Sequence, residues 1–449
     1  MTQSVRPLEA GEVKVGGAPE GYDALLLADL VARAQAPVSE RGPEDDRFAH
    51  RGPVLHIARD DQRAAALGEA LSVIAPEIPI LRFPAWDCLP YDRVSPNPAI
   101  VSDRMATLAT LAEDPRLPCL VIATVNAALQ RVPPLRTVYG ESWVGAVGAR
   151  CDTEELLAYL GRNGYRRAST VAEPGDFAIR GGVIDIYPPG AGDPVRLDLF
   201  GDTLESARRF DAESQRTVEK IDRVELAPIS EAMLTDEAVQ RFRRCYRETF
   251  GASGAQDPLY AAVSDGARFQ GMEHWLPFFH DRLDTLFDYL PRALVTVDHQ
   301  VDDAVVKRWE TIADHHRHRV EALEESEASR GLRAGQVYKP IDPEMLYLPA
   351  EELTTRLAGR AIRRFSPHQS PPGPGVIDAG GRMGRDFIEE RRSEEARLFQ
   401  NLADHLNALR SAGKTVALAS FSEGARDRLA TVLADHGVAG LAMTDRWRE

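Results

Sequence analysis

Cysteine is scarce in this sequence, and its distribution argues against cysteine-based sites. Cys88, Cys119, Cys151 and Cys245 are scattered over 449 residues, and no two of them have CxxC spacing. The pattern fits isolated reduced thiols better than a zinc site or a disulfide framework. We therefore predict a cytoplasmic protein.

Long apolar segments are also absent. No uninterrupted hydrophobic run approaches the roughly 20 residues of a membrane-spanning helix, and residues 1–17 lack the apolar core of a secretion signal. We expect neither membrane insertion nor secretion. The GxSxG and HExxH signatures are missing too, so the common hydrolase motifs give no grounds for predicting an enzyme.

Basic residues are outnumbered by acidic ones. Lys and Arg number 54 against 69 Asp and Glu, and the formal net charge is -15. Binding to a nucleic-acid backbone relies on clustered Lys and Arg, so this balance argues against a chain that holds DNA by itself, although a local basic patch remains compatible with it. The length allows for about three domains.

Apolar helices alternate with short apolar strands from about residue 22 to 124. The strands expected here are 53–58, 78–83 and 119–125. A compact α+β segment follows, from about 144 to 226, and the first pattern then resumes with helices at 239–250 and 303–330 and a strand at 293–298. This alternation predicts an α/β fold with a parallel sheet covered on both faces and a small α+β insertion.

The last part of the chain begins after a segment rich in proline and glycine, 365–375, which we interpret as a linker. Beyond it, leucines at 398, 402, 406 and 409 have helical spacing. A strand is expected at 415–420, a helix after 422 and an apolar run at 438–443. Gly413-Lys414-Thr415 follows a helix, so it is not a P-loop, and Gly413 is better explained as a helix C-cap.

The region from Gly175 to Arg216 has the pattern of a recognition surface. The strand expected at 194–200 has an apolar side and an opposite side, because side chains alternate along a strand. The apolar side is Val195, Leu197 and Leu199, and the opposite side is Arg196, Asp198 and Phe200. Gly201-Asp202 predicts a tight hairpin turn, which places Phe200 at a strand end where a partner can reach it.

A second hairpin is expected just upstream, where Gly181-Gly182 separates two short strands and brings Arg180 near the turn. Arginine and an aromatic side chain together are typical of interface hot spots. The alternative is that Phe200 caps the edge of its own small core while Arg196 and Asp198 form a solvated face. Spacing alone does not decide between the two.

Seven short motifs between residues 165 and 217 favour the recognition surface. They are Tyr165-Arg166, Gly175-Asp176-Phe177, Arg180-Gly181, Asp185-Ile186-Tyr187-Pro188, Arg196-Leu197-Asp198, Phe210-Asp211 and Ser214 to Thr217. This run resembles the second domain of the bacterial transcription-repair coupling factors, the Mfd family. In that family and in the related protein UvrB, the domain docks onto the damage-recognition ATPase UvrA. The positions that match the family's contact residues are Arg180, Arg196 and Phe200.

The resemblance covers only the N-terminal portion of the family. It implies a UvrB-like, RecA/helicase-like α/β domain in two halves, 1–140 and 229–360, around a UvrA-binding-type domain at 141–228. A linker at 361–375 and a partial third α/β domain at 376–449 would follow. The family continues with a polymerase-binding domain and a translocase motor, which this sequence lacks. The resemblance implies that RNA polymerase, double-stranded DNA and the motor's ATP and magnesium belong to those parts, and that a C-terminal domain holds the recognition surface in check.

Residues 16–23 have the glycine spacing of a P-loop without its chemistry. Gly16 and Gly21 are in place, but Tyr22 and Asp23 occupy the positions of the lysine and the magnesium-binding hydroxyl. Asp298 ends an apolar strand where a related helicase has an acidic pair. We predict that these five residues are an inactive nucleotide site, and that the chain has no catalytic residue, metal or cofactor.

Two further segments allow two interpretations each. Residues 83–108, with Trp86 and Arg104, match the family pattern and are interpreted as a plug over the sheet, with DNA contact as the weaker alternative. His315 and His318 lie one helical turn apart and could bind a metal, but a solvated helix face is favoured.

The function predicted from the sequence is that of a non-catalytic adaptor in transcription-coupled nucleotide-excision repair. It would recruit UvrA to lesions where RNA polymerase has stalled. The alternatives are an ATP-dependent DNA helicase or translocase and a UvrB-like protein that binds damaged DNA directly.

Overall fold

The computed structural model describes residues 11–35, 52–251, 257–328, 337–392, 397–420 and 422–444. The chain divides into two compact units, Met1–Gly381 and Arg382–Glu449. Each unit is described by itself. Among the described residues, no helix is both long enough and apolar enough to cross a membrane.

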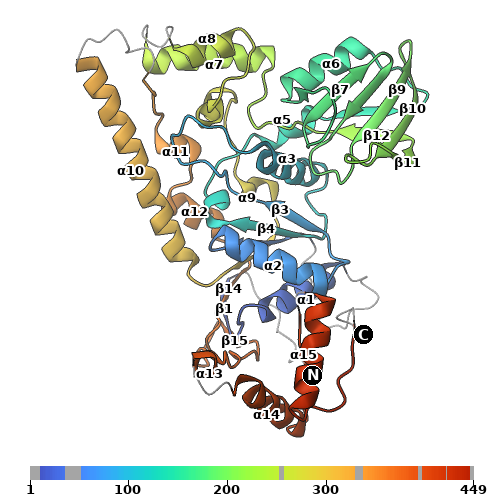
Figure 1. Ribbon diagram of the computed structural model, residues 1–449. Coiled ribbons are helices and arrows are strands. Elements are labelled where there is room, and N and C mark those ends of the chain that lie inside the picture. Colours follow the sequence, from blue (N-terminus) through green and yellow to red (C-terminus); the bar gives the residue numbers. More distant parts are fainter. Residues whose placement is uncertain are drawn as a thin grey trace. The chain divides into compact units, whose positions relative to one another are not determined.

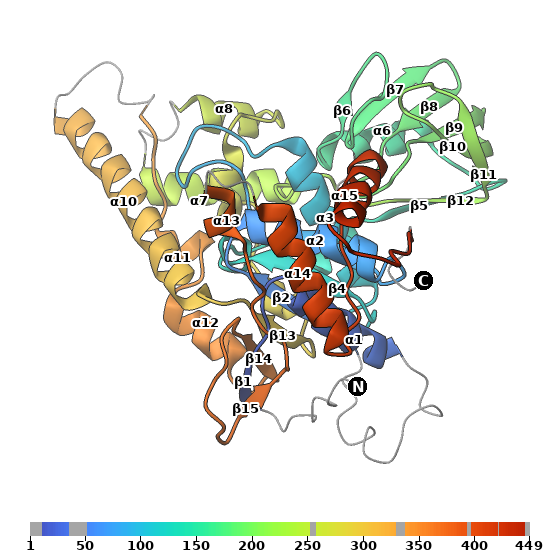
Figure 2. The same cartoon turned by 60° about the horizontal axis from the view of Figure 1, so that its bottom comes forward.

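A seven-stranded sheet forms the centre of the first unit, with the order β15-β1-β14-β13-β2-β4-β3 (Figures 1 and 2). All of its strand pairs are parallel. The strands are β1 (Glu12–Gly16), β2 (Val54–Ala58), β3 (Ile80–Phe83), β4 (Leu120–Thr124), β13 (Leu294–Val297), β14 (Ile362–Phe365) and β15 (Val376–Asp378). The predicted α/β fold with a parallel sheet is confirmed.

Helices cover both faces of this sheet, because its central strands are apolar on both sides. On β2, Val54 faces α1 (Tyr22–Gln35) and α2 (Asp61–Ile74), whereas Leu55 faces α3 (Pro98–Glu113) and α10 (Val301–Ala328). The other helices of this unit are α4 (Val125–Ala128), α5 (Leu135–Gly140), α7 (Asp236–Phe250), α8 (Pro258–Ser264), the 3-10 helix η3 (Met272–Phe278), α9 (Leu286–Tyr289), α11 (Pro343–Leu346) and α12 (Ala350–Leu357).

The small α+β domain contains a six-stranded sheet with the order β11-β10-β9-β8-β7-β6 and a two-stranded sheet of β12 and β5. Its elements are β5 (Trp143–Ala146), α6 (Thr153–Arg162), β6 (Arg166–Arg167), β7 (Asp176–Arg180), β8 (Val183–Ile186), β9 (Val195–Phe200), β10 (Thr203–Phe210), β11 (Thr217–Ile221) and β12 (Arg223–Leu226). One face of the larger sheet packs against Leu156 and Leu160 of α6. Both predicted hairpins are present.

A buried ion pair joins α3 to the segment where the chain leaves the small domain. Arg104 Nε donates to Glu231 Oε1 at 2.6 Å, and Trp86 Nε1 donates to the same oxygen at 2.8 Å. Both charged side chains are fully buried. The weaker alternative of a DNA contact through Arg104 is therefore wrong, because its guanidinium is buried and paired with Glu231.

The second unit contains α13 (Ile388–Arg392), α14 (Leu398–Ser411) and α15 (Glu423–Asp435), with a small core around Leu406 and Leu433. Gly413 has φ +74°, and the amide of Lys414 donates to the Leu409 carbonyl, so the expected helix C-cap is confirmed. The strand expected at 415–420 does not form. A strand needs a neighbour for its backbone groups, and the described residues of this unit offer none.

The segment 365–375 connects β14 to β15, two strands that both pair with β1 in the same sheet. It passes over the end of β1, where the Gly17 amide donates to the His368 carbonyl at 3.0 Å. This contact positions the segment beside the glycine turn, as we call residues 16–23.

Candidate functional site

The side of the six-stranded sheet opposite α6 carries the predicted recognition residues. Strand register places them together, because Asp185 lies opposite Arg196 and Val183 lies opposite Asp198. We call this surface the outer face and define it as Arg180, Asp185, Arg196, Asp198, Phe200, Ser206 and Arg208. Figure 2 shows its strands, β7 to β10, side by side.

Phe200 is the most exposed large apolar side chain among the described residues, at 79%. It ends β9 directly before Gly201, whose φ of +63° makes the tight turn to β10. The amide of Leu199 donates to the Gly182 carbonyl at 2.7 Å, so Phe200 lies beside the turn that follows Arg180. The alternative that Phe200 caps its own core is wrong, since so exposed a ring buries little apolar area.

Arg196 is held flat against the sheet by Asp185. Its Nε and Nη2 donate to the two carboxylate oxygens of Asp185 at 2.6 and 2.8 Å, and its guanidinium lies 4.6 Å from the Phe210 ring centre. The hydrogen bond to Asp185 is the main cause that raises the pKa of the Arg196 guanidinium. Such a two-bond pair fixes orientation as well as charge.

Arg180 shares the same carboxylate more loosely. Its Nη1 lies 3.7 Å from Asp185 Oδ2, and its Nη2 donates to the Ser169 carbonyl at 2.9 Å. About half of the Arg180 side chain is exposed, whereas Asp185 is buried. The structure thus brings Arg180 and Arg196 to one buried acid, with Phe200 on the same face.

Sequence reasoning missed Asp185 as a site residue, although it stood in the quoted motif before Tyr187 and Pro188. The available signal was a carboxylate in an apolar strand, which is buried only with a cationic partner. Asp198 and Arg208 were missed in the same way, because their ion pair crosses from β9 to β10.

The five residues predicted for the inactive nucleotide site lie at the ends of β1 and β13. Asp23 Oδ1 accepts the amides of Gly21 and Ala24, both at 2.9 Å, so the start of α1 is occupied by its own carboxylate. The amide of Ala18 donates to the Ser366 carbonyl at 2.9 Å. These backbone N–H groups, which could otherwise bind a phosphate, therefore already donate hydrogen bonds within the chain.

Buried charges complete this arrangement. Arg63 of α2 forms an ion pair with Asp23, and its Nε lies 3.3 Å from Asp298 Oδ2. The Tyr22 hydroxyl donates to the Ala379 carbonyl at 2.9 Å. The cavity beside Asp23 and Asp298 measures only ≈ 30 Å³, whereas ligand pockets have about 300–1,000 Å³.

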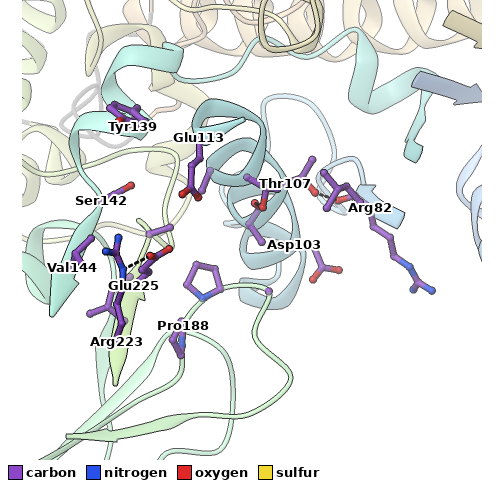
Figure 3. Close-up of a pocket in the computed structure, with 18 of the residues that line it drawn as sticks. Arg82, Asp103, Thr107, Glu113, Tyr139, Ser142, Val144, Pro188, Arg223 and Glu225 are labelled. Atoms are coloured by element: carbon purple, nitrogen blue, oxygen red, sulfur yellow. Dashed lines mark hydrogen bonds and ion pairs between the residues drawn. The ribbon is translucent and has the colours of Figure 1, made fainter. Parts of the chain in front are cut away.

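A larger cavity of ≈ 640 Å³ lies between α3 and the small domain (Figure 3). Glu113 and Asp103 of α3 line one side, and Pro188 and the ion pair of Arg223 with Glu225, at 2.6 Å, line the other. None of its lining residues belongs to the outer face. In the described parts of the chain, no group of three or more His, Cys, Asp or Glu gathers as a metal site requires.

Comparison with known proteins first identifies the class of the small domain. Residues 146–231 match the family model of the UvrB interaction domain. This range includes the whole outer face, so the surface belongs to a domain of that class.

The longer matches are to transcription-repair-coupling factors. The chain is 35% identical to that of Escherichia coli (strain K12) over 293 residues, which are 65% of this chain and 24% of the relative. It is 32% identical to that of Myxococcus xanthus over 87% of this chain and 33% of the relative. With that of Bacillus subtilis (strain 168) it shares 24% identity over 96% of this chain and 36% of the relative. The chain therefore spans about a quarter to a third of these relatives and is homologous to their N-terminal portion, as the resemblance predicted.

Proposed function

We propose that this chain is a non-catalytic adaptor in transcription-coupled nucleotide-excision repair, and that its outer face binds the damage-recognition ATPase UvrA. The observation that carries the proposal is Phe200, an aromatic ring with 79% exposure on the same face as two arginines, inside the part that matches the UvrB interaction domain. An exposed apolar ring beside cations is typical of an interface anchor.

The three residues would make different contacts with the partner, because their side chains are exposed to different degrees. Phe200 would enter an apolar pocket of the partner, and the half-exposed Arg180 would meet an acidic group there. Arg196 is mostly covered, since Asp185 takes its Nε and Nη2. It would therefore contribute the remaining edge of its guanidinium, held in a fixed direction.

The glycine turn supports the non-catalytic part of the proposal. Asp23 occupies the helix start, Arg63 neutralises Asp23 and Asp298, and the ≈ 30 Å³ cavity is too small for a nucleotide. The chain would thus need no cofactor of its own. RNA polymerase and double-stranded DNA would be partners of the remainder of the longer relatives.

The test is the affinity of this chain for purified UvrA, measured by biolayer interferometry. The triple change Arg180→Ala, Arg196→Ala and Phe200→Ala should abolish binding, with circular dichroism showing an unchanged fold. Tyr139→Ala is the matched control, because Tyr139 is an aromatic residue with 61% exposure that lines the α3 cavity instead. Binding that survives the triple change would refute the proposed surface.

A further inference from the structure

Arg208 extends the outer face by one strand. It lies on β10 directly opposite Arg196 of β9, and Lys220 of β11 lies directly opposite Arg208. Neighbouring residues on paired strands point to the same side of a sheet. Arg196, Arg208 and Lys220 therefore form a cationic row across β9 to β11. Arg180 of β7 lies outside this row, opposite Val183, and reaches it through Asp185, whose Oδ2 is 3.7 Å from Arg180 Nη1.

Two carboxylates lie among these cations and pair with two of them. Asp185 pairs with Arg196, and Asp198 pairs with Arg208, whose Nη2 lies 3.1 Å from Asp198 Oδ2. Asp198 also accepts the Ser206 hydroxyl, which fixes its position. Arg180 and the row together contain four cations against two acids, so this part of the outer face is positive, although the whole chain has a net charge of -15.

The hydrogen bonding of Arg208 is less complete than that of Arg196, whose Nε and Nη2 both donate to Asp185. Arg208 Nε is buried and has no hydrogen-bond partner within the described structure, while 31% of the side chain is exposed. A guanidinium has five N–H donors, so the pair with Asp198 leaves several of them unused. A partner carboxylate could take two of them at once, which is the preferred geometry for arginine.

We propose that Arg208 is a further UvrA-contact residue, and that the docking surface continues from Phe200 across β10 to Lys220, facing an acidic strip of the partner. This inference rests on the proposed function, since it assigns new residues to the same partner. Asp198 acts as a positioning residue that holds Arg208 toward the partner.

The test compares Arg208→Ala with Arg209→Ala in UvrA binding at low and high salt. Arg209 is a matched control, because it is the next residue of β10, points to the other side of the strand and pairs with Glu219 at 2.9 Å. Arg208→Ala should weaken binding about tenfold and reduce its salt dependence, because a charged interface contact is lost. Arg209→Ala should change binding by less than about twofold.

A second variant separates contact from folding. Arg208→Gln keeps a polar N–H donor on a shorter side chain and removes the charge, so it should fold normally and show the same reduced salt dependence. Arg208 variants that bind like the parent, while Phe200→Ala does not bind, would overturn this inference and leave the proposed function standing. A parent chain that fails to bind UvrA would overturn both.

Discussion

The glycine turn and the outer face use the same chemical groups to opposite effect. Both pair arginines with buried aspartates. Beside the glycine turn, Arg63 of α2 forms ion pairs with Asp23 and Asp298, and all three side chains are almost fully buried. On the outer face, Asp185 is buried, whereas Arg180 is half exposed and Phe200 is 79% exposed.

The comparison distinguishes a site whose backbone donors are already paired within the chain, which we call closed, from a site whose groups can still contact a partner, which we call open. In the glycine turn, the donors of Gly17 and Ala18 and the carboxylate of Asp23 are satisfied by the chain itself. On the outer face, an apolar ring and a partly unpaired guanidinium remain available. A partner can gain binding free energy from an exposed apolar ring that becomes buried and from N–H donors that have no hydrogen-bond partner in the free protein. The outer face offers both, so it is the surface suited to binding.

Removing the central cation of the glycine turn should have the largest effect. Arg63→Ala leaves Asp23 and Asp298 buried without their main counter-charge, and breaking a buried pair in this way costs about 3–5 kcal/mol of the free energy of unfolding. Urea unfolding at pH 7 measures the loss. Arg59→Ala is the control, since Arg59 is more exposed and lies 3.6 Å from Asp298, and it should cost only about 0–1 kcal/mol. Equal losses in both variants would contradict a closed, buried charge centre.

Truncating the exposed ring should have the next largest effect, on binding instead of stability. Phe200→Ala should weaken UvrA binding by about 2 kcal/mol or more, roughly 30-fold, because a hot-spot aromatic is lost. The unfolding free energy should stay within about 0.5 kcal/mol of the parent, since the ring is not part of the core. Titration calorimetry and urea unfolding measure the two quantities. A large loss of stability would show instead that the ring packs in the native state.

The sequence predicted the fold where strands are apolar throughout. The strands 53–58, 119–125 and 293–298 were recognised because each is a mostly apolar run, and they correspond to β2, β4 and β13. β1 and β14 were missed because Lys14, Arg363 and Arg364 interrupt the pattern. The strand expected at 415–420 fails for the opposite reason, since an apolar run without a neighbouring strand has nothing to pair with.

The candidate site was predictable only in part. Alternation along β9 placed Arg196 and Phe200 on the side away from the core, and the Gly201-Asp202 turn placed Phe200 at a strand end. The pairing of Asp185 with Arg196 and of Asp198 with Arg208 could not be assigned, because the partners lie on different strands and the local sequence does not determine the register. For the same reason the role of Arg63, 40 residues from Asp23, was out of reach.

Acid should weaken the α/β domain, because two of its histidines are buried. Burial lowers the pKa of His56 on β2 and of His274 on η3 to about 4. In the unfolded chain a histidine has a pKa of about 6.5. Below that pH the unfolded chain binds protons at these histidines that the folded chain does not bind, so stability falls as the pH falls from 6.5 to 4. Each histidine contributes up to about 1.4 kcal/mol per pH unit. Thermal unfolding of the parent and of His56→Leu at several pH values should show a smaller pH slope in the variant.

Restoring the P-loop residues should have the smallest effect on ligand binding and gives the sharpest test of the closed turn, although it removes the buried partner of Arg63 and should cost stability. Tyr22→Lys with Asp23→Thr returns the lysine and hydroxyl that phosphate binding needs. The amides of Gly17 and Ala18 would still donate to the carbonyls of His368 and Ser366, so ATP would find no free backbone cradle. We expect neither binding of a fluorescent ATP analogue nor DNA-stimulated ATP hydrolysis by this variant or by the parent. If the double change gained nucleotide binding, the side chains at positions 22 and 23 alone would have prevented it. The segment 365–375 would then have to release the amides of Gly17 and Ala18 to the phosphate.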